Sequence, residues 1–104
     1  MKNMDIEIIK SPSEGVIKML KSRLFSKDFL ENDEFDTVGL VQGKLVEMFV
    51  ATDIAEKTAA VEVFEVKGIC PQHFTMIAVL GDVASVNEAL NNIVKEFKER
   101  VSIK

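Results

Sequence analysis

Apolar and polar residues recur along the chain with two different periods, and the changes of period predict its elements. A period of two predicts half-buried strands, and apolar residues three or four positions apart predict helices. The mostly apolar run 37–41 predicts a central strand that is covered on both faces. The strands are expected at 4–9, 37–41, 61–66 and 74–80, and the helices at 14–24, 45–59 and 86–97.

Polar residues mark where two of these helices begin. Ser13 before Glu14 supplies a helix start, and Ser85 with Glu88 spells a capping box. Residues 25–36 break the periodic pattern and form an acidic connector, whose phenylalanines are expected to dock on the body of the domain. The middle helix is expected to turn a wide apolar stripe toward the core. That stripe comprises Leu45, Met48, Phe49, Thr52, Ile54, Ala55 and Ala59.

The predicted order is β-α, a connector, then β-α-β-β-α, which indicates an α+β fold with one four-stranded antiparallel sheet backed by helices. The central unit resembles the ferredoxin-like βαββαβ motif with its last strand moved to the front. That arrangement is a circular permutation. A chain of 104 residues has the usual size of one domain, so 1–104 is expected to fold as a single unit.

Charge and composition narrow the classes of function. The chain is 47% hydrophobic and carries a net charge of −4, with lysines and arginines scattered among acidic residues. It has no Trp or Tyr. A nucleic-acid binder would show a basic face and stacking aromatics, so no nucleic-acid partner is expected. No apolar run has the length of a signal peptide or a membrane span, so a cytoplasmic protein without a membrane partner is expected.

Four short motifs in permuted order resemble the bacterial microcompartment (BMC) domain family. They lie at 36–43, 53–63 and 80–86, the last with a Gly-Asp-Val turn, and at 6–12, which looks like the strand that normally closes the domain. The order matches the permuted shell proteins of ethanolamine and propanediol utilisation. The resemblance implies a BMC-domain cyclic hexamer that is a non-enzymatic tile of a microcompartment shell. It also matches Lys57 to a lysine at the edge between neighbouring hexamers.

The loop from Gly68 to His73 is similar to that of the divergent shell proteins of glycyl-radical propanediol microcompartments. That similarity implies an iron–sulfur cluster, a labile 4Fe-4S cluster shared between subunits, in a central pore. Ordinary family loops are small and Gly/Ser-rich around a metabolite pore, so the departure argues against a simple conduit. The implied partners are other shell proteins and encapsulated redox enzymes. The implied cofactor-binding residues are Gly68, Cys70, Pro71, Gln72 and His73, with Cys70 as the metal ligand.

Cys70 is the only cysteine, which excludes an intrachain disulfide. A lone cysteine is often a small buried hydrophobe. Its place between Gly68 and Pro71, in a polar-tipped loop outside the strand pattern, instead favours an accessible thiol. One thiolate is short of the four ligands of a cluster. If the loop faces the axis of a cyclic oligomer, each subunit adds one Cys70 to a ring around the pore.

The neighbouring residues have simpler interpretations as well. Pro71 either fixes the backbone beside a ligand or is an ordinary turn proline. His73, the only histidine, is a solvated loop residue, a ligand, or a group that orients a ligand or couples to a proton. Gln72 has the weakest case. Lys57 is either an edge residue or a solvated helix lysine.

Two other classes of function stay open from the sequence. The first is an enzyme with Cys70 as nucleophile and His73 as base. Its weakness is that no orienting Asp or Asn and no oxyanion hole can be assigned. The second is a trimeric ferredoxin-like small-molecule sensor, for which the expected phosphate-cradling glycine loop is not found.

Overall fold

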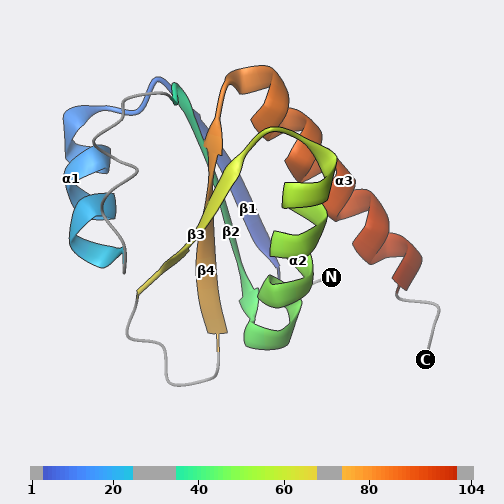
Figure 1. Ribbon diagram of the computed structural model, residues 1–104. Coiled ribbons are helices and arrows are strands. Elements are labelled where there is room, and N and C mark those ends of the chain that lie inside the picture. Colours follow the sequence, from blue (N-terminus) through green and yellow to red (C-terminus); the bar gives the residue numbers. More distant parts are fainter. Residues whose placement is uncertain (1–3, 25–34, 68–73, 101–104) are drawn as a thin grey trace.

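The seven predicted elements form in the expected order (Figure 1). The computed structural model describes residues 4–24, 35–67 and 74–100. The predicted docking of Phe25 and Phe29 lies outside these residues. The strands are β1 (Asp5–Lys10), β2 (Thr37–Lys44), β3 (Glu62–Val66) and β4 (Phe74–Gly81), and the helices are α1 (Glu14–Arg23), α2 (Leu45–Thr58) and α3 (Val83–Arg100).

The strands form one antiparallel sheet in the order β1-β2-β4-β3. β4 lies between β2 and β3, which α2 connects, so this part of the chain is a split βαβ unit. β1 comes first in the chain and pairs with the outer side of β2, where a ferredoxin-like domain has its last strand. The permuted topology predicted from the sequence is therefore confirmed.

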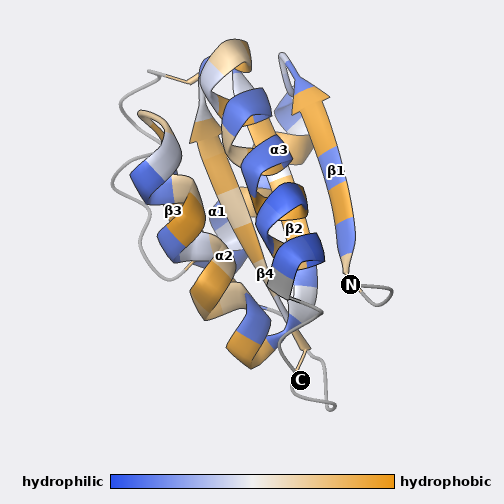
Figure 2. Cartoon of the chain, turned by 90° about the vertical axis from the view of Figure 1, so that its right-hand side faces the viewer, coloured by the Kyte–Doolittle hydropathy of each residue, from blue (hydrophilic) through white to orange (hydrophobic). Residues whose placement is uncertain are grey.

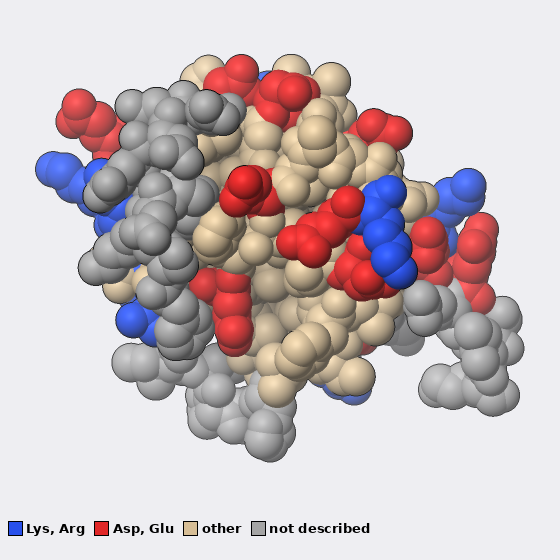
Figure 3. Space-filling model, viewed as in Figure 1, with Lys and Arg blue, Asp and Glu red and all other residues tan. Residues whose placement is uncertain are grey.

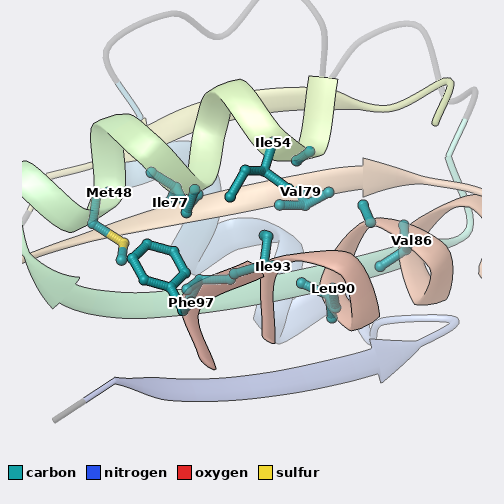
Figure 4. Packing of buried hydrophobic residues seen from close by; sticks show 12 residues of the cluster. Met48, Ile54, Ile77, Val79, Val86, Leu90, Ile93 and Phe97 are labelled. Carbon is teal, nitrogen blue, oxygen red and sulfur yellow. The ribbon is translucent and has the colours of Figure 1, made fainter. Parts of the chain in front are cut away.

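Helices cover the two faces of the sheet unequally. In Figure 1 the sheet is seen near its edge, with α1 on one side and α2 and α3 on the other. Ile77 and Val79 of β4 point to the α2/α3 face and pack with Ile93 (Figure 4). Ala78 and Leu80, which alternate with them along β4, belong to the cluster on the α1 face. Both β4 faces are therefore buried. So are those of β2, whose Val41 lies in one cluster and Val38 in the other, as the apolar run 37–41 predicts.

α3 approaches β2 closely because position 39 is a glycine. A Cβ on Gly39 would lie 2.9 Å from Leu90 Cδ1 and 3.1 Å from Val86 Cγ1, closer than carbon atoms pack. Leu90 and Val86 are themselves buried. The missing side chain thus lets α3 settle on the strand.

α1 closes the other face with fewer residues. Leu20 and Leu24 pack there with Val38 and Val66, and Leu24 is only 1% exposed. Full burial of a leucine side chain is worth about 1.5–3 kcal/mol, so Leu24 is a main attachment point of α1. Phe35, at the end of the connector, packs against the same cluster. For this phenylalanine the predicted docking is confirmed.

The predicted stripe of α2 is wrong at two positions. Leu45 and Phe49 are exposed, and the core-facing side instead includes Ala51, which is fully buried beside Met48 and Ile54. The reason is that the first turns of α2 are apolar on nearly all sides, so spacing alone does not select the face that meets the sheet.

The predicted capping box of α3 is also wrong, because Asp82 caps the helix. The Ser85 backbone N–H donates to Asp82 Oδ1 at 2.8 Å and the Ser85 hydroxyl donates to Asp82 Oδ2 at 3.2 Å. The helix begins at Val83, so Ser85 already lies in its first turn. The backbone hydrogen bond from Ser85 holds the pKa of Asp82 below its ordinary value of 3.8.

We expect Asp82→Ala to lower the urea midpoint at pH 7, because it removes the acceptor of the Ser85 N–H. A lowered carboxyl pKa stabilises the fold above the unfolded-state pKa and stops doing so as pH falls through the folded-state pKa. The difference between wild type and Asp82→Ala should therefore shrink below pH 3.8. Ser85→Ala keeps the backbone donor and serves as the control. A larger loss in Ser85→Ala than in Asp82→Ala would contradict this cap.

Candidate functional site

The loop that contains the candidate ligands joins β3 to β4 at one end of the sheet. β3 ends at Val66 and β4 begins at Phe74. The predicted cofactor-binding residues lie outside the described residues, so their roles stay predictions. These are Gly68, Cys70, Pro71, Gln72 and His73. The structure shows the framework on which the loop stands.

The end of α1 holds the first residue of this connection. The Lys67 backbone N–H donates to the Arg23 carbonyl at 2.6 Å, and Arg23 Nη1 donates to the Lys67 carbonyl at 3.4 Å. Next to this pair, Leu24 forms an antiparallel β-bridge with Val66. α1 therefore fixes the base of the loop. Sequence reasoning missed this clamp because it joins residues that are far apart in the chain.

The other end of the loop meets the start of α2. Phe74, the first residue of β4, pairs with Lys44 of β2, and α2 begins at the next residue. The Glu47 carboxylate accepts the Lys44 backbone N–H at 3.1 Å. A lysine side chain has no acceptor, so only this half of a capping box forms. The start of α2 is thus fixed beside the strand that leaves the loop.

Lys57, the predicted edge residue, lies in the last turn of α2, at the opposite end of that helix. Its ammonium group is 3.0 Å from the Asp53 carboxylate, and the two side chains are 76% and 61% exposed. An exposed ion pair of this spacing is worth only about 0.3–0.5 kcal/mol. Lys57 can therefore exchange Asp53 for another partner at little cost.

An open polar hollow of about 660 Å³ lies beside Lys57, between the end of α2 and α3. Asn92 Nδ2 donates to Thr58 Oγ1 at 2.7 Å, and the Thr58 hydroxyl donates to the Ile54 carbonyl at 2.6 Å. These bonds tie α3 to the last turn of α2. The surface around Lys57 is therefore polar and firmly supported.

Residues 4–24, 35–67 and 74–100 contain no group of three or more His, Cys, Asp or Glu that could hold a metal ion. Cys70 and His73, the only cysteine and histidine of the sequence, both belong to the loop. None of the described helices is long and apolar enough to cross a membrane.

Residues 37–103 match the family model of the BMC domain, and the chain belongs to this family of bacterial microcompartment shell proteins. The match begins at β2 because β1, in permuted order, takes the place of a strand after α3. The protein is thus a structural protein located in a microcompartment shell. The predicted family resemblance is confirmed.

Two solved structures of GrpU shell proteins, both ligand-free, are similar to this chain. The GrpU microcompartment shell protein from Clostridiales bacterium 1_7_47FAA is 33% identical, with a TM-score of 0.68, over 90% of this chain and 92% of that one. The GrpU protein from Pectobacterium wasabiae is 34% identical, with a TM-score of 0.69, over 86% of this chain and 98% of that one. No curated protein matches the chain.

Proposed function

We propose that this shell protein works as a cyclic homo-hexamer whose copies bring their loops together at a central pore that holds an iron–sulfur cluster. The observation that carries the proposal is that the only cysteine and the only histidine share the β3–β4 loop of a shell domain similar to GrpU. The cluster would carry electrons across the shell, to or from enclosed redox enzymes.

The donor set fits such a cluster when several copies share it. Thiolate is the soft ligand that iron–sulfur clusters require, and each chain has one, on Cys70. A cluster takes about four thiolates, so one chain is insufficient and a hexamer supplies an excess. A 4Fe-4S cubane takes only about four thiolates, so the equivalent thiols of six copies cannot all bind it and some stay unligated. We therefore expect partial occupancy and sensitivity to oxygen.

The residues around Cys70 support this role by their chemistry. Pro71 restricts the backbone next to the thiolate and has no N–H of its own. The backbone N–H groups of Gly68 and Ile69 can donate hydrogen bonds to sulfur, which raises the reduction potential of a cluster. His73 and Gln72 supply further polar groups for orienting ligands or for proton exchange. At the base of the loop, Arg23 and Lys67 hold the backbone in place.

Lys57 is proposed to act between hexamers. It is exposed, it lies at the end of α2 remote from the loop, and its ion pair with Asp53 is weak. A neighbouring hexamer, or another shell protein, can therefore displace Asp53 and pack against the aliphatic stem of the lysine.

We expect the purified protein to have about six times the 11.6 kDa subunit mass, because the ring of thiols requires closed symmetry. Light scattering at micromolar protein concentration measures the mass of the particle. A subunit-sized particle would exclude both the ring and the shared pore.

We expect Lys57→Ala to leave the mass of the single ring unchanged and to reduce its association into sheets. The substitution removes an exposed pair worth only about 0.3–0.5 kcal/mol, so the subunit itself should be as stable as wild type. Electron microscopy of overexpressing cells shows the assemblies. Equal sheets in wild type and Lys57→Ala, or none in either, would remove the support for an edge role.

We expect Cys70→Ser to abolish cluster binding without changing the oligomer, because Cys70 is the only thiolate of each chain. His73→Ala should do less: loss of an orienting group typically costs about 10–100-fold in metal affinity, so its cluster should bleach faster in air. Iron content and visible absorption after anaerobic reconstitution measure both variants, and light scattering is the control. Wild-type iron in Cys70→Ser would refute the pore cluster. A lost oligomer would instead assign Cys70 to the core.

A further inference from the structure

The first two turns of α2 expose large apolar side chains. Val46 is 67% exposed, Phe49 70% and Leu45 43%. Within the part of the chain that the structure describes, five large hydrophobic residues are exposed, and these are three of them. The other two, Met19 and Val83, lie on other helices. Figure 2 shows that the first turns of α2 are apolar, and Figure 3 shows an uncharged area over the start of α2.

Two of these side chains, Leu45 and Phe49, border a groove. Leu45 and Phe49 line a groove of about 300 Å³ between α2 and the β3–β4 strands, where Val63 and Ile77 add apolar surface. Single exposed apolar residues are normal in soluble proteins, whereas a contiguous apolar patch marks a surface that something covers.

The patch lies at the same end of the sheet as the loop. Phe74, the residue after the loop, pairs with Lys44, the residue before α2. α2 then runs 14 residues, about 21 Å, toward Lys57 at its other end. Along the way its exposed residues change from apolar to charged, with Asp53 and Glu56 before Lys57. α2 therefore leads from the loop to the proposed edge and changes its surface chemistry on the way.

We infer that Leu45, Val46 and Phe49 are covered by the neighbouring copy of this chain in the ring. The inference rests on the proposed cyclic oligomer. Copies converge where their loops meet the axis, so the surfaces beside each loop must touch the next subunit. Obligate interfaces bury apolar residues and leave charged ones at the rim, which is the order found along α2. In a cyclic interface the patch meets a different surface of the neighbour, not itself.

A tryptophan substitution tests this in the intact protein. The chain has no Trp or Tyr, so the indole of Phe49→Trp is the only strong fluorophore. We expect blue-shifted emission and protection from acrylamide quenching in the ring, and red-shifted, quenchable emission when dilution dissociates it. Solvent-exposed emission in an intact ring would overturn the inference. So would an indole that becomes shielded only when another protein is added, because the patch would then belong to that partner.

A matched pair of substitutions on α2 gives a second test. Phe49→Glu and Lys57→Ala each lower the net charge by one, at opposite ends of the helix. We expect Phe49→Glu to raise the protein concentration at which half of the rings dissociate by at least about tenfold, because substitution of a buried aromatic residue weakens an interface. Lys57→Ala should leave this concentration unchanged. Because Phe49 is 70% exposed in the single chain, the far-UV spectrum should be retained.

The outcomes separate this inference from the proposed function. A wild-type monomer refutes the ring itself and this interface with it. A wild-type ring in which Phe49→Glu assembles normally refutes only the interface. If Phe49→Glu fails to fold, the emission of Phe49→Trp decides.

Discussion

Burial of both faces of β2 and β4 is the constraint on which the rest of the structure depends. Two central strands with no solvent-exposed face need helices on both sides of the sheet. The chain supplies α2 and α3 on one side and α1 on the other. The approach of α3 depends on the missing side chain at Gly39. On the opposite face, Leu24 is drawn into the core, and its burial brings Arg23 to the base of the loop. Core packing and the frame of the site therefore have one origin.

The sequence was sufficient for the type and order of the elements, because strong periodicity is a local property. The permuted strand order followed from the family resemblance and the orphan strand at the front. Two local interpretations failed for reasons visible in the structure. Asp82, not Ser85, is the N-cap of α3, because the helix begins earlier than the apolar spacing indicates. The spacing places Leu45 and Phe49 in the core because apolar residues that face outward from a subunit have the same sequence pattern as those that face inward.

The candidate site, like the fold, was predictable from the sequence only in part. A lone cysteine between Gly68 and Pro71 is visible in the sequence, and Lys57 is on the surface, which fits an edge residue and a solvated helix lysine alike. The clamp between Arg23 and Lys67 was not predictable, since it consists of one main-chain hydrogen bond and one from the Arg23 guanidinium to a main-chain carbonyl, between distant segments that no sequence pattern connects. The permutation places β1 at the front, and α1 follows it before β2, where the end of α1 holds the base of the loop.

The two outer strands also limit how copies of this protein can join. Among the residues that the structure describes, β1 pairs in the sheet only with β2, and β3 pairs with β4 and, through a single bridge at Val66, with Leu24. β1 carries the exposed acids Asp5 and Glu7 and the exposed Lys10, and β3 carries the exposed acids Glu62 and Glu65. Charged edge strands resist pairing with one another, and acidic side chains outnumber basic ones on both edges. Growth by strand addition, which would turn a flat layer into a fibre, is thereby opposed by electrostatic repulsion, and assembly is left to helices and loops.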